Sequence, residues 1–85
     1  MMNKNREQDY MKTYEIVATY LNGCAGAAYP QTSFEEVELD SPDDYILTKH
    51  SRDFKKFMKE APSIGRTLYT YDTGTVTYIY EFTEL

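Results

Sequence analysis

The sequence predicts an α+β fold, a single small domain in which one helix packs on an antiparallel β-sheet, with elements in the order β-β-α-β-β. Two runs rich in Thr and Tyr near the end of the chain alternate in polarity, and Asp72-Thr73-Gly74 joins them. A further alternating run occupies residues 13–21. Between these runs, Ser41-Pro42 precedes two acidic residues, a pattern typical of a helix start. These observations together indicate a helix laid on a sheet.

The length of 85 residues suits one domain, which we place at residues 11–85. Residues 1–10 show no apolar periodicity, and we expect a disordered leader there. The single cysteine excludes an intramolecular disulfide, and no apolar run near the start could serve as a signal peptide or membrane span. We therefore expect a cytoplasmic protein without a membrane partner.

The first two strands are expected over residues 13–21 and 34–40. In residues 13–21 both alternating sets are partly apolar, which favours an inner strand. A turn at Asn22-Gly23 and a loop of small residues at 24–28 follow. In residues 34–40, Val37 and Leu39 alternate with acidic residues. Although Thr32 and Ser33 each begin a pattern that could cap a helix, the alternation favours a strand with a solvated acidic face.

The helix is expected to begin after Ser41. Its apolar face is defined by residues spaced three or four apart, namely Ile46, His50, Phe54, Phe57 and Ala61. Pro62 is expected to end it. Since Ser51 could cap a new start, one broken helix and two shorter helices both remain open.

The final hairpin is expected to pair residues 66–71 with residues 75–83, with Gly74 supplying the left-handed residue of the turn. One face of the second strand carries four apolar or aromatic side chains: Val76, Tyr78, Tyr80 and Phe82. Because each aromatic side chain buries roughly 150–250 Å², this face is predicted to supply much of the core.

Charge is segregated along the chain. Residues 13–48 carry seven acidic residues and no Lys or Arg, whereas residues 49–66 carry six basic residues and two acidic ones. Such separation gives a folded surface two electrostatic faces, which is more typical of a binding protein than of a catalyst.

The acidic candidates for partner binding are Glu35, Glu36, Glu38, Asp40, Asp43 and Asp44. On a strand, Glu36, Glu38 and Asp40 would project in one row spaced about 6.5–7 Å apart, close to phosphate spacing along a nucleic-acid strand.

Two alternatives use other surfaces. The predicted helix would align basic side chains that could contact phosphates in a small nucleic-acid-binding protein: Lys49, Arg52, Lys55, Lys56 and Lys59. The net charge of −5 disfavours direct binding to a polyanion. In the other alternative, the Tyr-rich hairpin forms the edge of a homodimer in a self-associating accessory protein.

No catalytic, metal or cofactor site is predicted, so we expect a protein that is not an enzyme. Asp72-Thr73-Gly74 matches the active-site triplet of aspartic proteases, but its place between two strands indicates a turn. Cys24 and His50 are two residues of common types, without a third group to complete a triad. They also lack the spacing of metal ligands.

Short patches of the chain resemble one compact family of Cas9 inhibitors among the anti-CRISPR proteins, which are small inhibitors of bacterial defence encoded by phages and mobile elements. The patches are Lys12-Thr13-Tyr14, Asn22-Gly23-Cys24-Ala25-Gly26 and Tyr80-Glu81-Phe82-Thr83-Glu84-Leu85. The resemblance implies a non-enzymatic inhibitor that binds a nucleic-acid-processing defence complex. None of that family's contact residues can be placed on this chain.

Overall fold

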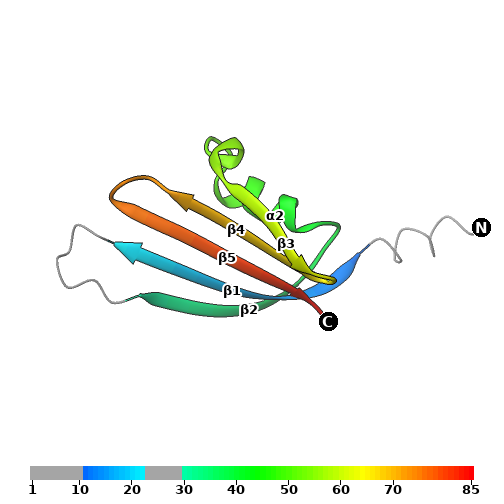
Figure 1. Ribbon diagram of the computed structural model, residues 1–85. Coiled ribbons are helices and arrows are strands. Elements are labelled where there is room, and N and C mark those ends of the chain that lie inside the picture. The colour runs from blue at the N-terminus through cyan, green and yellow to red at the C-terminus, as the bar shows by residue number, and fades with distance from the viewer. Residues whose placement is uncertain (1–10, 23–29) are drawn as a thin grey trace, which may run out of the picture.

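A computed structural model describes residues 11–22 and 30–85 and shows an α+β domain built on a five-stranded antiparallel sheet (Figure 1). The predicted leader at residues 1–10 and the predicted loop at residues 24–28 lie outside the described residues. In chain order the elements are β1 (Lys12–Asn22), β2 (Gln31–Leu39), helix α2 (Pro42–Lys49), the 3₁₀ turn η2 (Phe54–Lys56), β3 (Met58–Ser63), β4 (Arg66–Asp72) and β5 (Val76–Glu84).

The strand order across the sheet is β2-β1-β5-β4-β3, so the first and last strands of the chain are neighbours at its centre. Ile16 of β1 lies opposite Phe82 of β5, and Tyr80 of β5 lies opposite Tyr69 of β4. The prediction that residues 13–21 form an inner strand is confirmed, because β1 pairs with β2 on one side and β5 on the other. The edges of the sheet are β2 and β3.

The core lies on one face of the sheet, beneath α2. Its buried side chains are mostly aromatic: Tyr14, Ile16, Tyr45, Ile46, Tyr69, Tyr80 and Phe82. Phe82 is the centre of this cluster, with the Tyr69 and Tyr45 rings at centroid distances of 5.4 and 5.5 Å in edge-to-face orientation. Such pairs stabilise the fold by about 0.5–1.5 kcal/mol each beyond their buried area. The prediction that the face of Tyr80 and Phe82 supplies the core is confirmed.

The predicted extent of the helix is wrong, since α2 ends at Lys49 instead of continuing to Pro62. The backbone N–H of His50 closes the last turn on the carbonyl of Ile46, at 2.7 Å, and the chain then turns into η2. Residues 58–63 form a fifth strand, whose first four residues the prediction had placed in the helix. The element order is therefore β-β-α-β-β-β, in which β3 extends the sheet beyond β4.

The predicted hairpin is confirmed, and its turn is built by side chains of the Asp-Thr-Gly triplet. Gly74 has φ of +100°, a conformation that suits glycine. The N–H of Gly74 donates to Oδ1 of Asp72 at 2.8 Å, and the N–H of Val76 donates to the Thr73 hydroxyl at 3.0 Å. However, both hairpin strands are interior, because β1 flanks β5 and β3 flanks β4. The prediction that this hairpin is a dimer edge is therefore wrong.

None of the helices within residues 11–22 and 30–85 is long and apolar enough to cross a membrane.

Candidate protein-interaction surface

Helix α2 and turn η2 pack on one face of the sheet, and the opposite face, here called the open face, looks toward the viewer in Figure 1. The pairing register shows which side chains share it. Val17 lies opposite Phe34 of β2 and Glu81 of β5, and Glu81 lies opposite Leu68 of β4. Side chains directly opposite one another project to the same face of a sheet. Among the described residues, no helix or turn covers this face.

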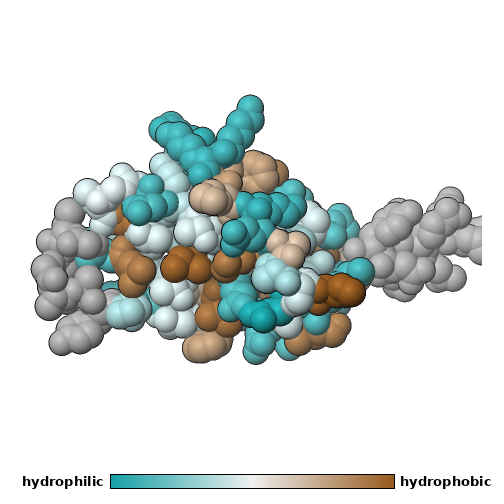
Figure 2. All heavy atoms as spheres, in the orientation of Figure 1, coloured by the Kyte–Doolittle hydropathy of each residue, from teal (hydrophilic) through white to brown (hydrophobic). Residues whose placement is uncertain are grey.

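A continuous apolar band crosses the open face and takes one side chain from each strand. Its members, from one edge of the sheet to the other, are Phe34, Val17, Ile79, Leu68 and Met58. Consecutive members are directly opposite or diagonal neighbours, which places them within roughly 4.5–8 Å of one another. The two end members are strongly exposed, with 72% of Phe34 and 66% of Met58 accessible to solvent. Figure 2 shows hydrophobic atoms gathered over the middle of this face.

An acidic edge adjoins the band where β1 and β2 pair. We define it as Glu15, Glu36, Glu38 and Asp40, all of which are exposed. Glu15 and Glu36 lie directly opposite each other in the register, and Glu38 lies one alternation further along β2. Within residues 11–22 and 30–85, none of these four carboxylates forms an ion pair. Like charges directly opposite each other destabilise a sheet.

The prediction that Glu36, Glu38 and Asp40 form one row on a strand is only partly correct. Glu36 and Glu38 share the open face, whereas Asp40 lies in a bend beyond the end of β2. Asp44 is exposed in the first turn of α2. The predicted set therefore divides between the acidic edge, the helix and the core side of the sheet.

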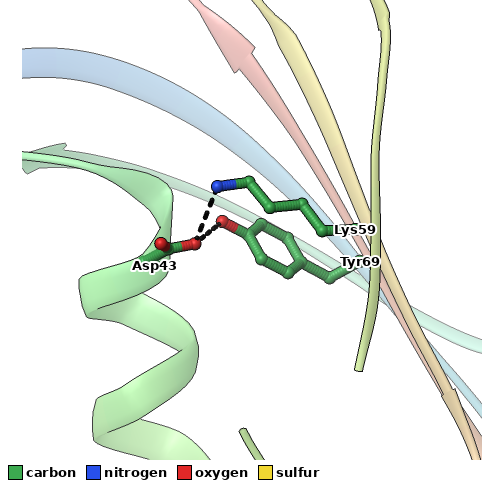
Figure 3. A network of polar contacts seen from close by, with 3 residues as sticks. All are labelled: Asp43, Lys59 and Tyr69. Atoms are coloured by element: carbon green, nitrogen blue, oxygen red, sulfur yellow. Dashed lines mark hydrogen bonds and ion pairs between the residues drawn. The ribbon is translucent and has the colours of Figure 1, made fainter. Parts of the chain in front are cut away.

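Glu35 and Asp43 lie on the core side, where they hold the helix against the sheet. The Tyr45 hydroxyl donates to Oε1 of Glu35 at 2.8 Å. Asp43 accepts hydrogen bonds at Oδ1 from the Tyr69 hydroxyl and from Nζ of Lys59, the latter at 3.1 Å (Figure 3). These two carboxylates have structural partners, unlike those of the acidic edge.

Partial burial and hydrogen bonding together shift the pKa values of Asp43 and Tyr69. Burial raises the pKa of Asp43, but the hydrogen bonds from Tyr69 and Lys59 outweigh it, so that the net pKa lies below its ordinary value. Burial, followed by the neighbouring Asp43 carboxylate, raises the pKa of Tyr69 far above its usual range. The contact therefore pairs a carboxylate with a neutral phenol and an ammonium at neutral pH.

The basic candidates do not form a single helix stripe. Lys49 ends α2 and lies over the Tyr45 ring at 5.1 Å, while Lys59 on β3 is paired with Asp43. Arg52 lies in the turn after the helix, and Lys55 and Lys56 lie in η2, immediately before the edge strand β3. Figure 2 shows hydrophilic side chains projecting from the upper side of the molecule, where this turn lies. The acidic and basic segments thus lie near opposite edges of the sheet.

His50 lies among aromatic rings instead of on a helix face. Its Nε2 shares a hydrogen bond with the Tyr80 hydroxyl at 2.7 Å, and the Tyr78 ring lies 4.7 Å away. Burial, together with the charge of Lys49, lowers the pKa of His50 despite the opposing effect of Asp53. Cys24 lies outside the described residues, so its predicted loop position stays a prediction.

A groove of about 500 Å³ opens on the helix side of the sheet beside Tyr45. Tyrosine rings and one ion of each sign line it: Tyr20, Tyr45, Tyr78, Tyr80, Glu35 and Lys49. Among the described residues, no cluster of three or more His, Cys, Asp or Glu side chains could hold a metal ion.

Searches against protein-family models, curated proteins and solved structures found no match for this chain.

Sequence reasoning missed both Glu15 and the apolar band. Glu15 could have been paired with the acidic strand only if the register were known, because 20 residues separate it from Glu35. Ile79 is the one apolar side chain among the alternate, outward positions of residues 75–83, and it gave a partial signal for the band.

Proposed function

We propose that the protein is a non-enzymatic inhibitor that binds a larger partner and covers a nucleic-acid-binding or nuclease surface, as anti-CRISPR proteins do. One observation carries the proposal. Glu15 and Glu36 lie directly opposite each other in an exposed part of the sheet, without a base paired to either among the described residues. A basic groove on a partner would relieve the repulsion that this pair creates.

The spacing of the acidic edge supports mimicry of a nucleic-acid backbone. Glu36 and Glu38 are two residues apart on one strand, so their Cα atoms are separated by about 6.5–7 Å. That spacing is close to the phosphate separation along one strand. Asp40 continues the negative charge beyond the end of β2. On the resemblance to anti-CRISPR proteins, we extend the proposal to a cytoplasmic nucleic-acid-processing defence complex as the partner.

The test measures cleavage of a labelled duplex by purified RNA-guided nucleases of the Cas9 type, with and without the protein. We expect inhibition that falls by at least tenfold in potency when Glu15 and Glu36 are both replaced by Lys. The control is Glu60→Lys, which is compared with the single reversal Glu36→Lys because both change the net charge by the same amount; Glu60 is exposed on β3 at the opposite edge of the sheet. Equal loss in Glu36→Lys and Glu60→Lys would show that net charge alone acts, and inhibition unchanged by the double reversal would overturn the acidic-edge proposal.

A second candidate function is nucleic-acid binding through the turn that precedes β3. Arg52 and Lys55 are exposed there and form no ion pair with any residue in the described part of the chain. In that case the protein alone would retard a labelled duplex or single strand at physiological salt, with an affinity that falls steeply as salt rises. Loss of retardation in Arg52→Glu with Lys55→Glu would favour this function over inhibition.

A further inference from the structure

We infer that β2 is a docking edge to which a partner adds an antiparallel strand, and that basic residues of the added strand alternate with apolar or hydroxyl residues. The inference rests on the proposed function in one respect, namely that the same acidic edge meets a basic partner. It adds how the two chains are joined, which is by backbone hydrogen bonds along β2.

The outer side of β2 carries backbone groups without a partner strand in the described part of the chain, where β2 pairs with β1 alone. The N–H of Leu85 donates to the carbonyl of Thr13, so the backbone groups of Thr13 face β5. Because these groups alternate between the two sides of a strand, every second residue of β1 faces β5 in the same way. The residues of β2 opposite that set have N–H and C=O groups that face outward: Thr32, Phe34, Glu36 and Glu38.

The two edges of the sheet differ in their protection against strand addition. Edge β3 contains Lys59 and Pro62. Its register also shifts between Glu60 and Ser63. Lysine, proline and bulges are features by which proteins block pairing at an edge. Edge β2 has nine residues and contains no proline, no lysine and no register shift, so it is the edge that can accept another strand.

The side chains of β2 specify the chemistry of the added strand. Glu36 and Glu38 project to the open face, and residues paired directly with them would project to the same face. Lys or Arg at those positions would neutralise carboxylates that form no ion pair within residues 11–22 and 30–85. On the other face of β2, Val37 and Leu39 pack against the core, so apolar or hydroxyl residues suit the alternate positions.

A second copy of this chain does not fit the same edge. β2 contains three glutamates and no Lys or Arg, so pairing of two β2 strands would supply no counter-charge in any register. Edge β3 offers Lys59, but its ammonium is already paired with Asp43. The glutamates of β2 therefore disfavour self-association through this edge and favour a basic strand.

The first test is fluorescence anisotropy of a labelled nine-residue peptide, capped at both ends, in which lysine alternates with threonine and valine. We expect saturable binding to the full chain. A peptide of the same composition with its lysines in one block is the control for net charge, and it should bind at least about tenfold more weakly. Equal binding of the two peptides would overturn the inference, because charge without alternation would then suffice.

Single charge reversals test which edge binds the alternating peptide. Glu36→Lys should weaken binding by at least about tenfold, because a lysine would then face a lysine of the peptide. The matched control is Glu60→Lys, which changes the net charge equally on edge β3 and should leave the affinity within about threefold. Equal losses in the two variants would contradict docking at β2.

Backbone methylation of the peptide separates hydrogen bonding from charge. In the antiparallel arrangement the lysine N–H groups face β2, whereas those of valine and threonine face away. Methylation of the two central lysine nitrogens should therefore weaken binding at least about tenfold, and methylation of the two valine nitrogens should leave it within about threefold. Equal effects of the two modifications would overturn strand addition.

Amide hydrogen exchange measured by NMR locates the added strand. The peptide should slow exchange at Phe34, Glu36 and Glu38 and leave Lys59 unchanged, and the reverse pattern would contradict the inference. The nuclease assay fails or succeeds separately. Peptide binding at β2 without nuclease inhibition would refute the proposed function and support strand addition. Inhibition that is lost in Glu15→Lys with Glu36→Lys, in a protein that binds no alternating peptide, would refute strand addition and support the proposed function.

Discussion

The Tyr69 hydroxyl on β4 donates a hydrogen bond to the carboxylate of Asp43 in the first turn of α2, and this contact joins the helix to the sheet (Figure 3). Tyr69→Phe removes the hydroxyl, so the Asp43 carboxylate would lose one of the two donors that it has here, and the burial of Tyr69 limits replacement by water. We expect Tyr69→Phe to lower the free energy of unfolding by about 1–2 kcal/mol, as measured by urea denaturation. Tyr71→Phe, two residues along the same face, is the control and should change it by less than about 0.5 kcal/mol.

The lowered pKa of His50 predicts a dependence of stability on pH. The folded protein binds the His50 proton less readily than the unfolded chain, whose pKa is near 6.5. The contribution of neutral His50 is therefore complete above about pH 6.5 and is lost as pH falls toward the folded pKa. Urea midpoints measured from pH 8 to pH 5 should fall in the wild type and fall less in His50→Gln. Parallel profiles for the two proteins would contradict the prediction.

Relieving the repulsion between Glu15 and Glu36 is expected to stabilise the fold. Glu36→Thr removes one of two like charges that lie directly opposite each other on paired strands. We expect an increase of about 0.2–1 kcal/mol in the free energy of unfolding at low salt, and a smaller increase at high salt. Glu60→Thr is the control because Glu60 lies opposite Leu68. A similar gain in the control would show that threonine propensity is the cause.

The two apolar side chains in the middle of α2 are expected to respond differently to truncation. Ile46 is fully buried, whereas 43% of Leu47 is exposed. Ile46→Val should therefore lower the melting temperature, at a cost of about 0.5–1.5 kcal/mol. Leu47→Val should cost less, so the difference between the two variants reports the packing of α2 on the sheet. Equal losses would show that helix propensity, not burial, dominates.

The fold class could be predicted because its signals are local. Alternation in residues 75–83 and the Asp-Thr-Gly turn each specify structure within a few residues, and the structure confirms both. The start of α2 at Pro42 followed in the same way from a proline at the first helical position and acidic residues in the first turn.

The end of the helix could not be predicted, because the same spacing of apolar residues also fits a chain that leaves the helix and turns back over the core. Ile46, Phe54 and Phe57 all contact the core, as the spacing indicated. They do so from a short helix, a 3₁₀ turn and the residue before β3. A chain that turns back over the same core thus satisfies the same inward positions. Pro62 ended the predicted helix, but it lies in edge strand β3, where proline is tolerated.

The candidate site was less predictable, since it depends on pairing between distant segments. Residues of the apolar band come from all five strands, and their neighbours are set by strand order and register. The acidic residues were visible in the sequence, but the partners of Asp43 and Glu35 were not. Only the packing of α2 shows that these two carboxylates are engaged within the fold.

The central position of β1 and β5 has a consequence for folding kinetics. Even the closest paired residues of these two strands, Asn22 and Val76, are 54 positions apart (76 − 22), and the entropic cost of closing that loop precedes any gain from the pairing. Folding is therefore expected to be slow for a domain of this size, in the millisecond-to-second range typical of sheets with distant pairings. Until that pair forms, β1 and the β4–β5 hairpin remain separate, each with an unpaired edge, and this interval is when aggregation competes most strongly with folding.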